Sequence, residues 1–121
     1  MQHQWLTSYL LKKPQTREDF PFGDDISVFK VKNKMFATLA LGQDKTHYWM
    51  NLKCDPDEAL ALRDIFPAVI PGYHMNKRLW NTIILDGSIP KGEIERMIDN
   101  SFKLVVSKMT KKDQRSINIH I

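Results

Sequence analysis

The chain has 121 residues, the usual size of one domain, and a formal net charge of +4. Its hydrophobic fraction of 42% and its three tryptophans argue against an intrinsically disordered polypeptide. The single cysteine, Cys54, excludes an internal disulfide, and no apolar stretch reaches the roughly 18–20 residues that span a membrane. The first residues lack the pattern of a signal peptide. We therefore expect one cytoplasmic domain covering residues 1–121.

Basic and acidic residues are segregated along the chain. The basic clusters are Lys30, Lys32 and Lys34; His74, Lys77 and Arg78; and Lys103, Lys108, Lys111, Lys112 and Arg115. The acids gather at positions 18–19, 24–25 and 55–58. Such segregation can create a positive face that attracts phosphate backbones or other anionic partners. An ordinary solvated surface gives the same pattern, so charge alone does not decide between them.

The first half of the chain predicts a helix, a loop and three strands. Apolar residues recur at helical spacing over 5–10, and Pro14 stops that helix. Residues 15–25 are expected to form an ordered loop that Phe20 and Phe22 anchor to the core. Residues 26–53 then alternate with a period of two, with a short turn at Asn33. This alternation predicts a three-stranded antiparallel meander.

The second half predicts helices around two further strands. Asp55 and Pro56 suit the start of a helix, and Pro67 ends it. A short strand is expected near 69–71 and a strong one over 80–85. Apolar residues spaced by three and four over 94–109 predict a long amphipathic helix. Thr110 and Asp113 resemble a capping box for a short last helix, while the alternating isoleucines at 117, 119 and 121 also fit a docked extended tail.

The element order is therefore α-β-β-β-α-β-β-α, with a possible extra helix. Strands grouped before and after a helix indicate an α+β fold, with an antiparallel sheet and helices packed on one side.

Catalytic and metal-binding patterns are weak in this sequence. The four histidines, at 3, 47, 74 and 120, lack ligand spacing, and there is no C-x-x-C pair. Cys54 follows a strand and is expected to be a small core residue. The five glycines form no phosphate-binding loop, and Ser88 suits a helix cap better than a nucleophile. We therefore expect no enzyme activity, no cofactor and no metal.

The segment 72–82 differs from the rest of the chain. Its cations, Lys77 and Arg78, would attract phosphates, while His74 and Asn76 could contact bases or sugars. Trp80 could stack on a base. The structural alternative is that Trp80 anchors the core at the start of a strand and that the two cations lie on a solvated turn.

Six landmarks, in the same order, resemble the bacterial MmcQ/YjbR family. They are Pro21–Gly23 with Val28–Val31, Lys34–Ala37, Leu52–Pro56 with Leu62–Arg63, Pro71–Lys77 with Trp80–Thr82, Leu85–Pro90, and Ile98–Phe102 with Leu104–Val105. The resemblance covers nearly the whole chain and implies a frataxin-like (CyaY-like) α+β fold. It also implies a small DNA-binding protein with a "double-wing" arrangement of β-hairpins. Family members often carry His before the tryptophan, where this chain has Leu79.

The leading hypothesis is a DNA-binding module whose wings are the Lys30–Lys34 hairpin and the His74–Trp80 loop. The candidate nucleic-acid-binding residues are Lys30, Lys32, Lys34, His74, Asn76, Lys77, Arg78 and Trp80. The DNA-binding hypothesis requires both basic segments to lie on the same side of the molecule. The alternative is a protein-interaction or chaperone-like adaptor that uses an open sheet face carrying Trp49, Asn51 and Lys53. A third possibility is a small-molecule pocket between sheet and helices.

Overall fold

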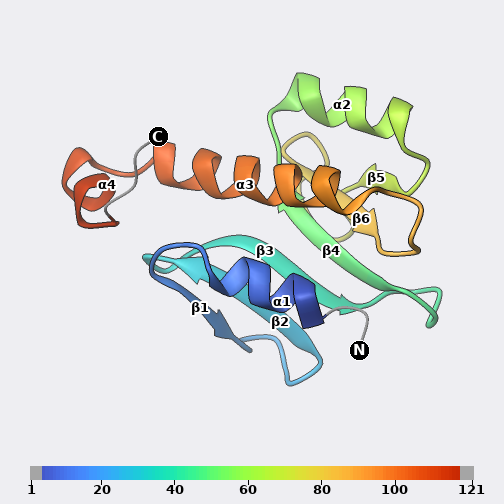
Figure 1. Ribbon diagram of the computed structural model, residues 1–121, viewed down its shortest axis with the longest axis horizontal. Helices are drawn as coiled ribbons and strands as arrows, with labels where there is room; N and C mark the ends of the chain where they lie inside the picture. The colour runs from blue at the N-terminus through green and yellow to red at the C-terminus, as the bar shows by residue number, and fades with distance from the viewer. Residues whose placement is uncertain (1–3, 118–121) are drawn as a thin grey trace.

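Residues 4–117 are described by the computed structural model (Figure 1) as four helices and a six-stranded sheet. In chain order the elements are α1 (Gln4–Leu11), β1 (Thr16–Asp19), β2 (Ile26–Val31), β3 (Lys34–Leu41), β4 (Tyr48–Lys53), α2 (Pro56–Ile65), β5 (Val69–Pro71), β6 (Trp80–Ile84), α3 (Lys91–Ser107) and α4 (Lys111–Ile117). The strands lie in the order β1-β2-β3-β4-β6-β5, and every neighbouring pair is antiparallel. The predicted α+β class with an antiparallel sheet is confirmed.

The predicted meander is formed by β2, β3 and β4. Lys32 and Asn33 have φ values of 51° and 63°, the left-handed conformation that a two-residue type I′ hairpin turn requires. The register shifts inside this hairpin, because Phe29 lies opposite Ala37 whereas Lys30 lies opposite Met35. Phe36 is therefore an extra residue in β3, which is a β-bulge.

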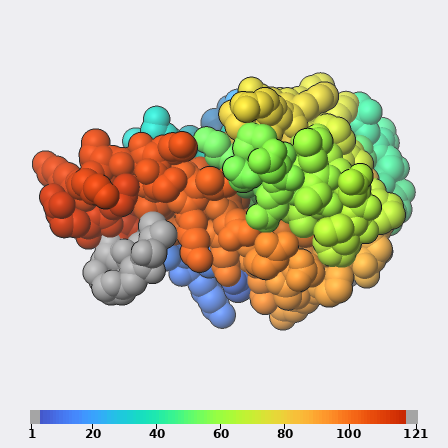
Figure 2. All heavy atoms as spheres, turned by 90° about the horizontal axis from the view of Figure 1, so that it is seen from above, coloured from blue at the N-terminus to red at the C-terminus, as the bar shows by residue number. Residues whose placement is uncertain are grey.

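The helices supply one side of the hydrophobic core. Buried residues of α1, α2, α3 and α4 join those of β2, β3, β4 and β6 in a single cluster. Within it, the rings of Phe36 and Phe102 meet edge to face at 5.1 Å. Figure 2 shows α2 and α3 side by side over the sheet, with α4 at one end. The sheet's other face carries a separate set of side chains, since Val28 is buried outside that cluster.

Ser101 of α3 connects this helix to two strands. Its hydroxyl donates to the carbonyl of Phe36 at 2.6 Å and accepts from the amide of Lys53 at 2.9 Å. Phe36 and Lys53 lie next to Ala37 and Leu52, the last pair of the β3–β4 ladder, and the fully buried serine bridges their backbone groups.

The expected loop over 15–25 was partly wrong, because Thr16–Asp19 forms the edge strand β1. Its four polar residues lack the alternation that identifies a strand, and its pairing with β2 holds it. Glu18 accepts a hydrogen bond from Ser27 at 2.6 Å. Phe20 and Phe22 are not core anchors, since they are 45% and 67% exposed.

The last helix is confirmed, with the Thr110 hydroxyl accepting from the Asp113 amide at 3.1 Å. Ile117 ends that helix and is buried. The extended tail suggested by Ile119 and Ile121 lies outside the described residues.

Candidate nucleic-acid interface

The two predicted wings leave the sheet at the same end. β2 reaches its turn at Lys32, and β4 returns to that end of the sheet at Lys53. Trp80, the first residue of β6, pairs with Lys53, so the β5–β6 loop also projects there. Figure 2 shows part of the β2–β3 hairpin (cyan) and the β5–β6 loop (yellow) along one margin of the molecule. Both basic segments therefore lie at one end of the sheet.

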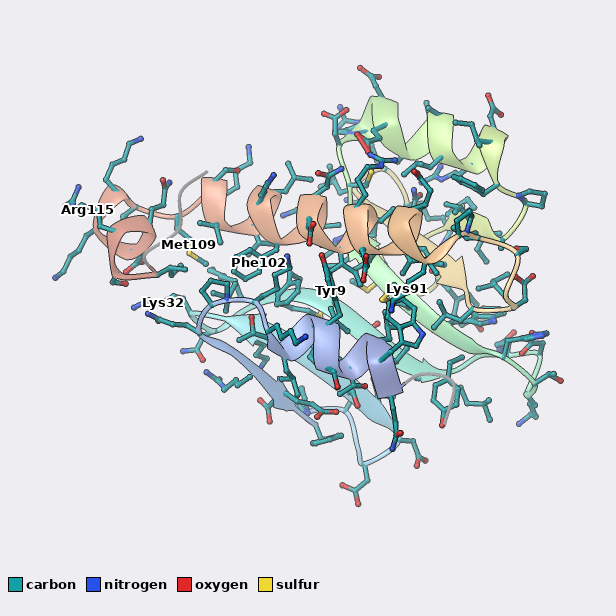
Figure 3. The ribbon with its side chains drawn as sticks, viewed as in Figure 1. Tyr9, Lys32, Lys91, Phe102, Met109 and Arg115 are labelled. Atoms are coloured by element: carbon teal, nitrogen blue, oxygen red, sulfur yellow. The ribbon has the colours of Figure 1, made fainter. Side chains whose placement is uncertain are left out.

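Lys32 and Lys34 line a basic cleft between the β2–β3 turn and the end of α3. The cleft measures about 400 Å³, and Lys53 and Lys108 contribute to it from other elements. Among its nine lining residues, all within 4–117, Asp113 is the single acid. Figure 3 shows Lys32 at the end of the molecule that also carries Met109 and Arg115. Four lysines around one carboxylate give this cleft an excess of positive charge, which favours anionic groups.

Lys30 lies apart from this cleft. Its ammonium pairs with the carboxylate of Asp19 on β1 at 3.1 Å. The hydrogen bond from Lys30 holds the pKa of Asp19 below its usual value. The cluster 30–34 is free of acids in sequence, but the neighbouring strand brings an acid to Lys30. The structure therefore groups Lys32 and Lys34 with Lys53 and Lys108 rather than with Lys30.

Arg63 of α2 holds the β5–β6 loop in place. Its Nε donates to Oδ1 of Asn81 at 2.8 Å, and its terminal nitrogen donates to the carbonyl of Lys77. Asn81 is 2% exposed, and its amide donates to the carbonyl of Ala59 at 3.4 Å. Sequence reasoning missed this role of Arg63, although Leu62–Arg63 was one of the family landmarks. Only the packing of α2 beside β6 gives the residue its partners.

The close packing of the β5–β6 loop explains why residue 72 is a glycine. A Cβ at Gly72 would lie 2.8 Å from the Cβ of Trp80 and 3.0 Å from that of Met75, closer than side chains pack. The Gly72 amide donates to the carbonyl of Trp80 at 2.9 Å. The loop therefore folds back on the start of β6, and a larger residue would force it open.

The polar residues of this loop are exposed. The exposed residues are His74, Asn76, Lys77 and Arg78. Lys77 donates from Nζ to the Gly72 carbonyl at 3.0 Å, and the Arg78 amide donates to Oδ1 of Asn76 at 3.0 Å. These bonds shape the loop while leaving its charges at the solvent boundary.

Trp80 occupies an intermediate position. It is half-buried at the first position of β6, opposite Lys53 on β4. Its backbone pairs in the sheet, and the β5–β6 loop packs against its Cβ side. Trp80 is therefore a strand anchor with part of its surface exposed.

Thiol and metal chemistry have little support in the described residues. Burial raises the pKa of the Cys54 thiol to about 11, so the thiol stays protonated at neutral pH. Within residues 4–117, no three His, Cys, Asp or Glu side chains form a group suited to a metal ion. In the same range, no helix is long and apolar enough to cross a membrane.

An antiparallel six-stranded sheet with helices on one face defines a small α+β protein. The YjbR family model matches residues 11–104, and the chain belongs to this family.

Two curated relatives match nearly the whole chain, and a third matches about half of it. The uncharacterized protein YbdF of Escherichia coli O157:H7 is 31% identical over 115 residues, which is 95% of this chain and 93% of YbdF. The uncharacterized protein YjbR of Escherichia coli K12 is 27% identical over 91% of this chain and 92% of YjbR. The uncharacterized protein YyaQ of Bacillus subtilis is 44% identical over a shorter match, 46% of each chain.

Solved structures share the fold. A Deinococcus radiodurans protein, DR2400, with the family-model domain DUF419, superposes with a TM-score of 0.86 at 35% identity, covering 95% of this chain and 86% of its own. The crystal structure of a Pseudomonas syringae protein, target PsR293, gives a TM-score of 0.76 at 32% identity, covering 87% of this chain and 99% of its own.

Proposed function

We propose that this protein is a non-enzymatic, cytoplasmic DNA-binding protein that binds the phosphate backbone with its two basic hairpins. The observation that carries the proposal is the common origin of both hairpins at one end of the sheet. There Lys32 and Lys34 share a cleft with Lys53 and Lys108, and Lys77 and Arg78 lie on the adjacent loop.

The physical basis is electrostatic. Lysine and arginine side chains that neutralise phosphates release condensed counterions, so affinity arises without base contacts and falls steeply with salt. The Arg63 anchor orders the β5–β6 loop before binding, which reduces the entropy lost when the complex forms. The electrostatic attraction is the same for every sequence, so it favours general binding to DNA over recognition of one site.

The test is a salt titration of duplex binding by fluorescence anisotropy. Two double variants, Lys32→Gln/Lys34→Gln and Lys77→Ala/Arg78→Ala, each remove two cations from one hairpin. Each should weaken binding to all sequences alike and reduce the slope of log K against log salt by roughly 1.8 if both cations contact phosphates.

A matched control removes the same charge elsewhere. Both Lys91 and Arg96 lie in the first two turns of α3, outside the basic cleft and outside both hairpins, so Lys91→Gln/Arg96→Gln should leave the slope unchanged. Undiminished binding by one hairpin variant would remove that hairpin from the interface. If the wild-type protein does not bind duplex or single-stranded DNA at low salt, the proposed function is wrong.

The adaptor alternative makes a different prediction. Protein purified at low salt would then carry a stoichiometric protein partner and no nucleic acid, and the hairpin variants would keep that partner. A high ratio of absorbance at 260 nm to 280 nm, abolished by nuclease, would favour DNA binding instead.

A further inference from the structure

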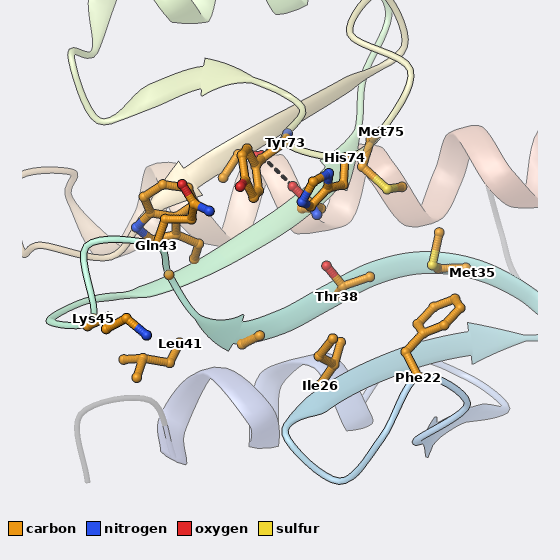
Figure 4. A pocket seen from close by; sticks show the side chains of 15 residues that line it. Phe22, Ile26, Met35, Thr38, Leu41, Gln43, Lys45, Tyr73, His74 and Met75 are labelled. Carbon is orange, nitrogen blue, oxygen red and sulfur yellow. Dashed lines mark hydrogen bonds between the residues drawn. The ribbon is translucent and has the colours of Figure 1, made fainter.

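The face of the sheet opposite the helices carries a hollow of about 560 Å³. Its floor is formed by β3, β4 and β6, where Thr38, Asn51 and Thr82 line it. Figure 4 shows Tyr73 and His74 on one side of the hollow and Phe22 on the other. A hollow of this size lies within the usual range for sites that bind small organic groups.

The walls present flat and polarizable side chains. The rings of Trp49 and Tyr73 meet edge to face at 5.6 Å, and the ring of His74 lies 4.1 Å from that of Tyr73. Across the hollow, Phe22 is 67% exposed, and Met35 and Met75 close one end. Aromatic rings and methionines stack well on a planar ring.

The floor adds a hydrogen-bond donor. The Thr82 hydroxyl accepts from the Tyr73 amide at 2.8 Å, so its own hydrogen donates to Oδ1 of Asn51. This bond fixes the orientation of the Asn51 amide and leaves its NH₂ group as the donor at the hollow. A planar ring that carries hydrogen-bond acceptors would meet this donor.

The lining of the hollow does not repel an anionic backbone. Of the fifteen residues that line it, all in the described part of the chain, none is Asp or Glu, whereas Lys45 and His74 are present. His74 also belongs to the loop that carries Lys77 and Arg78. A chain of phosphates held by that loop would pass the mouth of the hollow.

We propose that this hollow receives an unpaired base of single-stranded DNA. The inference rests on the proposed function and names the form of DNA that the site takes. Every base has a stacking face and ring acceptors, whereas in a duplex these are paired and covered by neighbours. The protein therefore binds single strands more tightly than a duplex of the same sequence and salt conditions.

The test compares two phenylalanines of one loop. Phe22 lines the hollow and Phe20 does not, and both are exposed, so neither substitution opens the core. Anisotropy is measured with a labelled single strand about 16 nucleotides long and with the matching duplex. Phe22→Ala should weaken single-strand binding about tenfold and leave duplex binding unchanged, while Phe20→Ala should change neither.

A second pair of variants separates stacking from folding. Tyr73→Ala removes a ring from the wall, whereas Tyr73→Phe keeps it, and both keep the backbone hydrogen bond to Thr82. Tyr73→Phe should bind single strands like the wild type, and Tyr73→Ala should lose about tenfold. Equal affinities of the two variants would overturn stacking at this wall.

The remaining outcomes separate this inference from the proposed function. If duplex binds as tightly as single strands and Phe22→Ala equals Phe20→Ala, the base site is wrong while duplex binding by the hairpins stands. If free thymidine monophosphate displaces the oligonucleotide at micromolar concentration, the hollow is a nucleotide site and the strand assignment is wrong. If neither form of DNA binds, both proposals fall together.

Discussion

Removal of Arg63 should loosen the β5–β6 loop and lower the stability of the whole domain. The side chain joins α2 to this loop through Oδ1 of Asn81 and the carbonyls of Lys77 and Trp80. In an Arg63→Met variant the apolar stem is largely kept and the donors are lost. The oxygen of Asn81, a residue only 2% exposed, is then left without its donor.

The size of the effect follows from these partners. A hydrogen bond from a charged donor contributes about 1.5–3 kcal/mol, and a buried acceptor left unsatisfied costs about 1–3 kcal/mol. The contact with the Trp80 carbonyl is long, at 3.4 Å, and Lys77 is exposed, so both add little. We therefore expect Arg63→Met to lower the free energy of unfolding by about 2–3 kcal/mol.

Urea denaturation followed by tryptophan fluorescence measures this loss. The control is Arg96→Met, because Arg96 makes ion pairs with Glu58 and Glu93 at an exposed surface. Such pairs contribute about 0–1 kcal/mol. Equal losses in the two variants, or a loss below about 0.5 kcal/mol for Arg63→Met, would refute the reasoning that the buried Asn81 oxygen depends on Arg63.

Two further predictions concern stability. Ser101→Ala leaves a strand carbonyl and a strand amide without their partner, and it should lower the free energy of unfolding, measured by urea denaturation, by about 2–4 kcal/mol. The control is Ser107→Ala, at an exposed serine of the same helix, which should lower it by less than about 0.5 kcal/mol. Burial, together with the hydrogen bond to Asp99, raises the pKa of Tyr9 from 10.0 to about 12. The stabilising contribution of Tyr9 is therefore complete below pH 10.0 and is lost as the pH rises through about 12. The free energy of unfolding of the wild type should exceed that of Tyr9→Phe by less and less across that range. A difference in free energy of unfolding that stays constant with pH would contradict this prediction.

Local patterns in the sequence predicted most of the secondary structure. Alternation over 26–53 and the left-handed turn at Asn33 depend on side-chain periodicity and backbone conformation, which act between near neighbours. The start of α2 is equally local, with the Asp55 carboxylate accepting from the amides of Asp57 and Glu58. The edge strand β1 was not predicted, because its extended conformation is stabilised by pairing with β2 and not by its own composition.

The candidate site depended on contacts between distant segments. The acid beside Lys30 comes from β1, and the lysines beside Lys32 come from β4 and the end of α3. Phe22 looked like a core anchor until the fold placed it at the edge of the open sheet face.

The sequence by itself determined the family, the antiparallel α+β fold and the two basic hairpins. Only the tertiary structure decided that Asp19 pairs with Lys30, that Arg63 anchors the β5–β6 loop and that a hollow lies on the open face of the sheet. The reason is physical: strand and helix patterns arise from residues a few positions apart, whereas ion pairs and cavities depend on segments that packing brings together.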